Sequence, residues 1–250
     1  LQPLIRGNDD SDGFVYHCGR ALARIQSQKP SELRHVSDID HRRVVHSVED
    51  YLRWIAPELH LLAHQVAQLL NSRLPVQAHL VASHGDFYSK QILSGPDRSV
   101  VLDFDSCGYI HPAFDIGTFL GHLYYDQIRG HLSETNRISA AELLADGYRS
   151  TNKSVSDSEI NIFTALALFR LSPHPFRFRV NDWFEQTKSL LSFALGLLQS
   201  EPSISSSVKQ EYFASQTFKD TSTEYFQTSD PLSFLLNTDS EHLKSTVIKE

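Results

Sequence analysis

The sequence predicts a mainly helical α+β fold that contains one small β-hairpin. Residues 13–28 and 182–199 place apolar side chains at spacings of three and four, the period of a helix that buries one face. Two short apolar runs, 91–93 and 100–102, flank a Gly-Pro-Asp-Arg sequence that is typical of a tight turn. Together these patterns indicate a set of helices built around a short pair of strands.

The first part of the chain predicts two helical regions joined by a polar connection. Residues 30–48 carry mixed charge and are expected to form an exposed connection. A second helical region covers 49–70 and is interrupted or restarted at Pro57, since proline lacks the N–H that a helix interior needs. The first helix, over 13–28, has a single apolar stripe formed by Val15, Cys18, Leu22 and Ile25.

The second part of the chain alternates short strands with helices. Residues 78–83 form an apolar approach to the hairpin. After the hairpin, the apolar segment 115–126 predicts a helix. The segment 173–177, with two prolines, is expected to be a turn or an extended connection before the last helix, 182–199.

Two capping-box sequences predict where further helices begin. In a capping box, a Ser side chain accepts the N–H of the residue three positions later, and the Glu at that position accepts the Ser N–H. Ser139 and Glu142 form one such pair, and Ser156 and Glu159 form the other. We expect a helix to start after each of the two serines.

The length, composition and charge of the chain favour some classes of protein and argue against others. The 250 residues suffice for one large domain or two small ones, and the 40% hydrophobic and 21% charged content is ordinary for a soluble globular protein. The net charge of −7 argues against a nucleic-acid partner, which would call for a basic stripe. No apolar run is long enough for a membrane span, and no secretory signal opens the sequence. Cys18 and Cys107 do not form a disulfide framework, so we expect reduced thiols and a cytoplasmic protein.

A polar loop and the strand after it carry the chemistry. The loop 84–91 reads His-Gly-Asp-Phe-Tyr-Ser-Lys-Gln and holds Asp86 and Gln91, while the predicted strand 100–105 delivers Asp103. Phosphoryl transfer from a nucleotide needs such a set: one acid positions or deprotonates the acceptor hydroxyl, and an amide oxygen and a second acid hold Mg²⁺ on the phosphates. The hairpin is expected to bring Gln91 and Asp103 toward each other.

These residues resemble the aminoglycoside phosphotransferase and choline kinase superfamily of small-molecule kinases. The typical loop of that superfamily is H-G-D-x-x-x-x-N, its metal strand is I/L-D-F/W-D/E, and a G-x-P-x-x-D-L segment follows. The present chain supplies H-G-D-x-x-x-x-Q, L-D-F-D, and then Gly108, Pro112, Asp115 and Ile116, over a resemblance that covers roughly residues 10 to 200. Gln91 departs from the commoner Asn, but it offers the same amide oxygen on a longer stem.

The resemblance implies a role for each residue of the motif. Asp86 is the catalytic base, Gln91 and Asp103 bind Mg²⁺ and the nucleotide, and Asp105 assists the metal. The residues expected to support the site are His84, which packs beneath the metal strand and fixes the loop backbone, Gly85, and Asp115, which accepts backbone N–H groups of the loop.

Each role has a plainer alternative. Asp86 would then cap its own turn, Asp105 would be solvated, and Asp115 would cap a helix. Lys90 either neutralises phosphate charge or is solvated. Arg170, His174 and Arg177 fall where the acceptor pocket of the superfamily is closed.

For the whole chain, the resemblance implies a protein-kinase-like C-terminal lobe over residues 1–200, with acceptor-side helices in 115–200. Residues 201–250 are expected to form a Ser/Thr-rich extension. An N-terminal lobe is not evident before Gly13, and methionine is absent even at position 1, so the sequence is compatible with a fragment.

The implied function is ATP-dependent or GTP-dependent phosphorylation of a hydroxyl group on a small molecule, with Mg²⁺. The acidic chain is compatible with a cationic acceptor, while the acceptor's identity and the oligomeric state stay open. The alternative function is a non-catalytic binding or regulatory module that keeps the kinase-like lobe.

Overall fold

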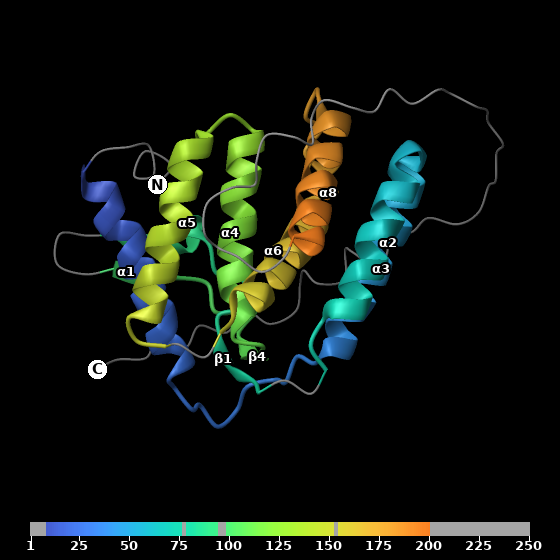
Figure 1. Ribbon diagram of the computed structural model, residues 1–250. Helices are drawn as coiled ribbons and strands as arrows, with labels where there is room; N and C mark the ends of the chain where they lie inside the picture. The colour runs from blue at the N-terminus through green and yellow to red at the C-terminus, as the bar shows by residue number, and fades with distance from the viewer. Residues whose placement is uncertain (1–8, 77–78, 95–98, 153–154, 201–250) are drawn as a thin grey trace. The chain divides into compact units, whose positions relative to one another are not determined.

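A computed structural model describes residues 9–76, 79–94, 99–152 and 155–200. The chain divides into two compact units, Leu1–Ser205 and Ser206–Glu250, and all described residues belong to the first unit. The expected extension over 201–250 and the expected turn at 95–98 lie outside the described residues. The predicted mainly helical α+β fold is confirmed, since helices dominate and the strands are short (Figure 1).

The helices follow one another with few strands between them. They are α1 (Asp9–Gln26), α2 (Asp38–Ile55), α3 (His60–Arg73), α4 (Ala113–Ile128), α5 (Glu134–Arg149), α6 (Asp157–Leu171), α7 (His174–Arg177) and α8 (Trp183–Gln199). Short 3-10 turns, η2 (Pro57–Leu59) and η3 (Ser89–Gln91), precede α3 and the hairpin. The strands are β1 (Val81–Ser83), β2 (Ile92–Ser94), β3 (Ser99–Val101) and β4 (Gly108–Ile110).

The most extensive helix contacts join α4 to α6 and α1 to α5, and α6 also packs on α8. Glycines let α4 approach α6 closely. A Cβ atom on Gly117 would lie 2.4 Å from the backbone carbon of Phe163, and one on Gly121 would lie 2.7 Å from the Ala167 Cβ. Since real Cβ contacts are longer, α4 and α6 meet at a distance that only glycine allows at these two positions.

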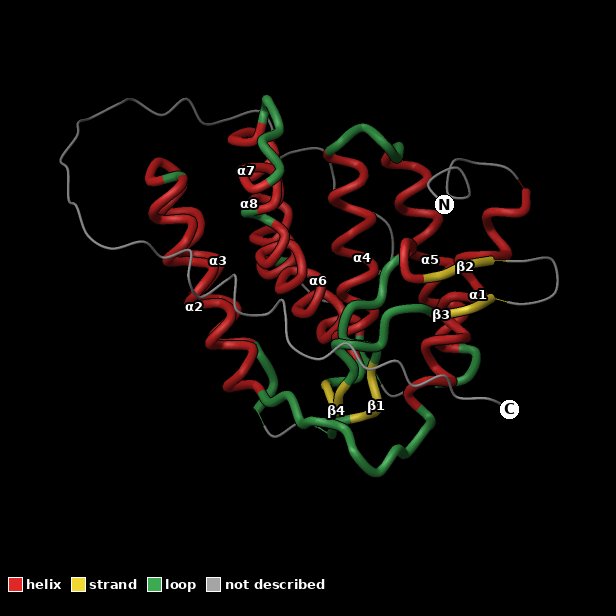
Figure 2. The backbone as a smooth tube through the Cα atoms, turned by 180° about the vertical axis from the view of Figure 1, so that it is seen from behind, coloured by secondary structure: helices red, strands yellow, loops and turns green. Residues whose placement is uncertain are grey.

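The four strands form two separate antiparallel pairs. β1 pairs with β4, and β2 pairs with β3 in the predicted hairpin, with Ile92 opposite Val101. Figure 2 shows β1 and β4 at one end of α4, and β2 and β3 in a different part of the molecule. The loop between β1 and β2 therefore connects the two sheets, and this loop is the one that carries the polar motif.

Two predictions of where helices begin differ from the structure. The connection expected over 30–48 is wrong in its second half, because α2 already begins at Asp38, where the Ser37 N–H donates to the Asp40 carboxylate at 2.9 Å. Ser139 does not open a helix, since it lies inside α5, which Ser133 caps by accepting the Asn136 N–H.

Two further local features concern α6 and α7. The capping box of Ser156 and Glu159 is present at the start of α6, as predicted. The segment expected to be a turn contains a one-turn helix, α7, which continues the chain from the end of α6 toward α8. In the part of the chain that the structure describes, no helix has the length and apolar character of a membrane span.

Candidate active site

The polar loop is tied to the core by Asp115, in the first turn of α4. The His84 N–H donates to one carboxylate oxygen of Asp115 at 2.7 Å, and the Gly85 N–H donates to the other at 2.9 Å. These are the hydrogen bonds expected of Asp115 from the sequence. The Asp115 side chain is fully buried, and burial raises its pKa to about 6 against the lowering effect of the two N–H donors. Both oxygens of one carboxylate are thus used to fix two consecutive peptide groups.

His84 links the same loop to the segment that carries Asp103. Its Nε2 lies 2.7 Å from the carbonyl oxygen of Leu102, which can only accept, so Nε2 carries the proton. Its Nδ1 then accepts the Asp86 N–H at 3.3 Å. The ring also packs against Phe104 and Phe87, with ring centroids 4.7 and 5.7 Å away. The imidazole thereby connects the residue before Asp103 to the backbone of Asp86.

Gly85 occupies a position that admits no side chain. Its φ of 85° lies in the left-handed region, and a Cβ atom there would be 2.0 Å from the carbonyl oxygen of Ser106. The loop therefore passes in direct contact with the segment that follows the hairpin. Asp115, His84 and Gly85 together hold the backbone of Asp86 from three sides.

The carboxylate of Asp86 is left available by this arrangement. It is partly exposed, and it accepts no hydrogen bond and forms no ion pair with another described residue. A turn-capping Asp would accept backbone N–H groups of its own loop, and no such bond is present within the described residues. The Asp86 charge raises the pKa of the Arg170 guanidinium, which burial lowers, so Arg170 lies within electrostatic reach.

The hairpin brings Gln91 and Asp103 together. The Leu102 N–H donates to the Gln91 carbonyl at 2.8 Å, and the Gln91 side-chain amide donates to the Asp103 carboxylate at 3.3 Å. β3 ends at Val101, earlier than the predicted strand 100–105, because Asp103 has a left-handed φ of 62° that extended backbone does not allow. A non-glycine residue held in this region is uncommon and is often found at functional sites.

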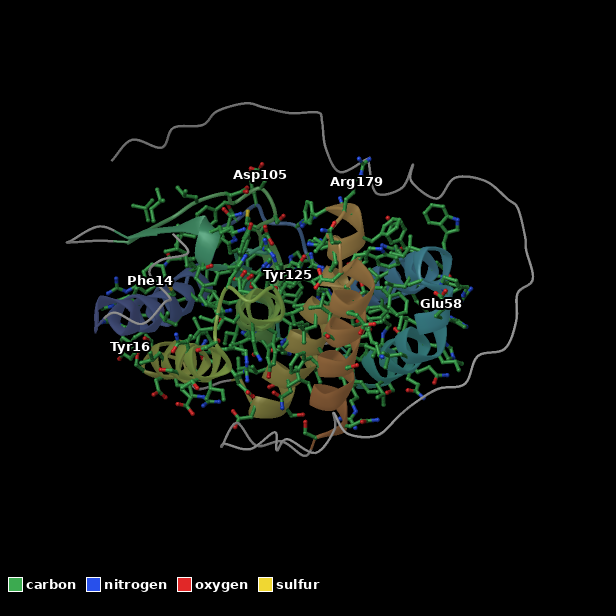
Figure 3. The ribbon with its side chains drawn as sticks, turned by 90° about the horizontal axis from the view of Figure 1, so that it is seen from above. Phe14, Tyr16, Glu58, Asp105, Tyr125 and Arg179 are labelled. Atoms are coloured by element: carbon green, nitrogen blue, oxygen red, sulfur yellow. The ribbon has the colours of Figure 1, made fainter. Side chains whose placement is uncertain are left out.

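The donor atoms at the hairpin fit a hard cation such as Mg²⁺. Asp103 offers carboxylate oxygens, and rotation of the Gln91 amide by half a turn would present its oxygen instead of its nitrogen. Among the described residues, no group of three or more His, Cys, Asp or Glu side chains is placed to hold a metal ion, so Asp105 does not complete such a group with Asp86 and Asp103. Figure 3 shows Asp105 at the edge of the molecule. Magnesium sites that include substrate phosphates commonly use only one or two protein ligands.

Sequence reasoning missed His122, which borders the loop on the side of α4. His122 follows Asp115 by seven residues, about two turns of helix, so both lie on the same face of α4. Its ring stacks on Tyr88 of the loop, with centroids 4.0 Å apart and planes 12° apart. The spacing from Asp115 was the available signal for His122.

The sequence matches a family model described as the phosphotransferase enzyme family, APH, over residues 3–151. No curated protein matches it. Among solved structures, a glucosamine kinase in complex with glucosamine, ADP and inorganic phosphate is similar, with a TM-score of 0.54 and 16% identity over 74% of this chain and 51% of the other. A second crystal form of glucosamine kinase gives a TM-score of 0.53 and 16% identity, over 74% and 52% of the two chains.

A choline/ethanolamine kinase family protein from Mesorhizobium loti gives a TM-score of 0.48 and 16% identity, covering 74% of this chain and 65% of the other. The present chain spans about half the length of the glucosamine kinases that it matches, and at this identity the likeness concerns the fold. The family model, in contrast, covers more than half of the chain and includes the whole loop and hairpin. The chain therefore belongs to the APH phosphotransferase enzyme family, as the resemblance of its loop and strand predicts.

Proposed function

We propose that residues 1–200 form the C-terminal lobe of a kinase that transfers a phosphoryl group from ATP or GTP to a hydroxyl group of a small molecule. The observation that carries the proposal is the fixed loop with an available carboxylate. Asp115, His84 and Gly85 hold the backbone around Asp86, whose side chain has no partner within the described residues. A positioned acid of this kind is what a hydroxyl acceptor needs.

In this proposal, Asp86 accepts a hydrogen bond from the acceptor hydroxyl and orients its oxygen toward the phosphoryl group. As the acceptor oxygen bonds to the γ-phosphorus, the bond from that phosphorus to the bridging oxygen breaks and the nucleoside diphosphate leaves, while the hydroxyl proton passes to the Asp86 carboxylate. The dense anchoring of the loop serves this step, because a misplacement of about 1 Å can cost about 10²-fold in rate. Helices within 115–200 provide the acceptor side, starting with the face of α4 that carries Asp115 and His122.

Gln91 and Asp103 form the proposed metal and nucleotide site, with Asp105 as a peripheral carboxylate. Mg²⁺, when bound, supplies charge neutralisation for the phosphates. The residues themselves orient each other across the hairpin, since the Gln91 amide already contacts the Asp103 carboxylate. His84 contributes by holding the carbonyl of Leu102, which precedes Asp103.

Two substitutions in the full-length protein test this assignment. Asp103→Ala should abolish Mg²⁺–nucleotide binding in calorimetry, because it removes the carboxylate at the hairpin. Asp86→Asn should lower kcat by at least about 10²-fold and leave nucleotide affinity little changed, because Asn keeps the shape but cannot take the proton. Asp146→Asn, an exposed change on α5 of the same chemical kind, serves as the control and should alter neither quantity.

The second candidate is a non-catalytic binding or regulatory module, favoured by Gln91 at a position where the superfamily commonly has Asn. The same variants separate the two functions. An Asp86→Asn protein with most of its kcat would refute the role of the base. Unchanged nucleotide affinity in Asp103→Ala would refute the metal site and favour the binding module.

A further inference from the structure

Basic and imidazole side chains gather around Arg170, which lies within electrostatic reach of Asp86. We call the set formed by His122, Arg170, His174 and Arg177 the basic cluster. α4 supplies His122, the last turn of α6 supplies Arg170, and α7 supplies His174 and Arg177. Because Arg170 acts electrostatically on both His122 and His174, these residues from three helices lie near one another.

Ring contacts fix two members of the basic cluster against α4 and the loop. His122 stacks on Tyr88, two residues after Asp86, at 4.0 Å. His174 lies edge-on to Tyr125 at 6.4 Å, and Figure 3 shows Tyr125 among the helices. The Arg170 guanidinium carbon lies 5.4 Å from the centre of the Phe114 ring, directly before Asp115 in the chain. Arg170 is therefore held near the root of the polar loop.

The two arginines of the basic cluster have no anionic partner of their own. Neither Arg170 nor Arg177 forms an ion pair with another described residue, whereas Arg149, for example, pairs with Asp157. The carboxylates that act on Arg170 are Asp86 and Asp115. Asp115 is committed to two backbone N–H groups, and Asp86 is the proposed base. A partly buried guanidinium in this setting retains hydrogen-bond donors for a ligand.

The imidazoles add hydrogen-bonding groups without adding charge. Burial is the main cause that lowers the pKa of His122 to about 3 and that of His174 to about 4, and the nearby cations lower both further. The groups that act on His122 are His174, Arg170 and Lys90, and those that act on His174 are Arg177 and Arg170; no carboxylate among the described residues is a cause of either shift. The charged side chains that act on these two rings are thus basic, although the whole chain carries a net charge of −7.

We infer that the acceptor carries an anionic group, a carboxylate or a phosphate, which Arg170 and Arg177 bind while its hydroxyl group is presented to Asp86. Guanidinium groups recognise both anions through paired N–H donors. A cationic acceptor, compatible with the net charge alone, would place its ammonium group beside two arginines that form no ion pair with another described residue. The inference rests on the proposed function, because it concerns the acceptor of the same reaction.

The test compares small molecules that differ in charge and share a hydroxyl group. Glycerate and glycerol 3-phosphate are matched to glycerol, gluconate and glucose 6-phosphate are matched to glucose, and choline and glucosamine represent cations. Calorimetry on the full-length protein with saturating Mg²⁺–nucleotide analogue gives the affinities, and phosphoryl transfer is measured in parallel with ATP and GTP. The carboxylate and phosphate arms distinguish the two sources of negative charge.

At least one anion should bind more tightly than its neutral partner, and Arg177→Gln should weaken it by at least about tenfold, the scale of a lost charged hydrogen bond. Arg170→Gln should weaken the binding of that anion to a similar extent. If Arg170→Gln does not fold, Arg177→Gln still tests the inference, because Arg177 is exposed and tolerates substitution. Arg177→Lys should retain part of the affinity, and the neutral partners should be unaffected. Arg24→Gln, an exposed charge change in the last turn of α1, is the matched control and should leave anion affinity as it is.

The inference is overturned if no anion binds better than its neutral partner, or if Arg24→Gln weakens anion binding as much as Arg177→Gln does. If choline or glucosamine is phosphorylated in a reaction that needs Asp86, and none of the anionic molecules is phosphorylated, the inference is overturned and the proposed function stands. If anion binding needs Arg170 and Arg177, but phosphoryl transfer does not need Asp86, the proposed function is overturned and the anion site stands.

Discussion

Gly85→Ala is the substitution whose effect the structure determines most directly. Two costs arise at this residue. The left-handed φ of 85° costs an alanine about 1–2 kcal/mol, and the new Cβ would lie 2.0 Å from the Ser106 carbonyl oxygen, an overlap that adds about 1–3 kcal/mol through forced shifts. The expected loss in free energy of unfolding is therefore about 2–5 kcal/mol. The shift also displaces Asp86, so kcat should fall by about 10²-fold.

Gly130→Ala provides a matched control, since Gly130 has a φ of 70° and nothing within 4 Å of the position of a Cβ atom. It should cost about 1–2 kcal/mol and leave kcat unchanged. Urea unfolding of the full-length protein gives both free energies, and a nucleotide-coupled assay gives kcat. Equal stability losses for the two variants, together with normal turnover of Gly85→Ala, would refute the proposed contact between the loop and Ser106.

Two further predictions concern the anchor and the hairpin. Asp115→Asn should destabilise the fold by about 1–3 kcal/mol near pH 5, because its amide N–H₂ would face a backbone N–H. Burial raises the pKa of Asp115 to about 6, above the ordinary 3.8, so in the wild-type protein the folded state binds the Asp115 proton more tightly than the unfolded state does. The stability that this proton binding adds to the wild-type protein is lost as pH rises from about 4 through 6, and the difference in free energy of unfolding between wild type and Asp115→Asn should therefore narrow in urea titrations. A difference that stays constant with pH would contradict this prediction. Gln91→Asn should weaken Mg²⁺–nucleotide binding by about tenfold or more in calorimetry, because the shorter side chain cannot span the 3.3 Å contact to Asp103, and unchanged binding would indicate that this position has no role in the site.

The sequence predicted well those features that local chemistry determines. The Ser156 capping box, the last helix and the hairpin that joins Gln91 to Asp103 all depend on residues close together in the chain. The contact of Asp115 with the loop is not local, and it was predicted because the family resemblance supplied it. The catalytic and metal roles of the loop and hairpin residues remain proposals.

The features that were missed depend on contacts between distant segments or on competition between local signals. β4 pairs with β1 across the whole hairpin, and three-residue strands have no periodicity to detect. Ser139 matches the capping pattern, but Ser133 caps α5 one and a half turns earlier, so the helix has already formed. The basic cluster is assembled from three helices, and residue spacing within the chain places only His122 relative to Asp115.

The close approach of α4 and α6 at Gly117 and Gly121 bears on how the acceptor preference of the proposed kinase could change. At Gly117 the backbone of α4 lies against that of α6, and at Gly121 it lies against the Ala167 Cβ, so sliding one helix along the other would cause overlap at these two positions. New preferences would then arise by replacing side chains near the loop, such as Arg170, whose guanidinium lies beside Phe114 in the first turn of α4. A change of acceptor should therefore proceed by replacement of single charged side chains while the packing of α4 on α6 stays the same. The stability of this helix pair would then be nearly independent of the acceptor.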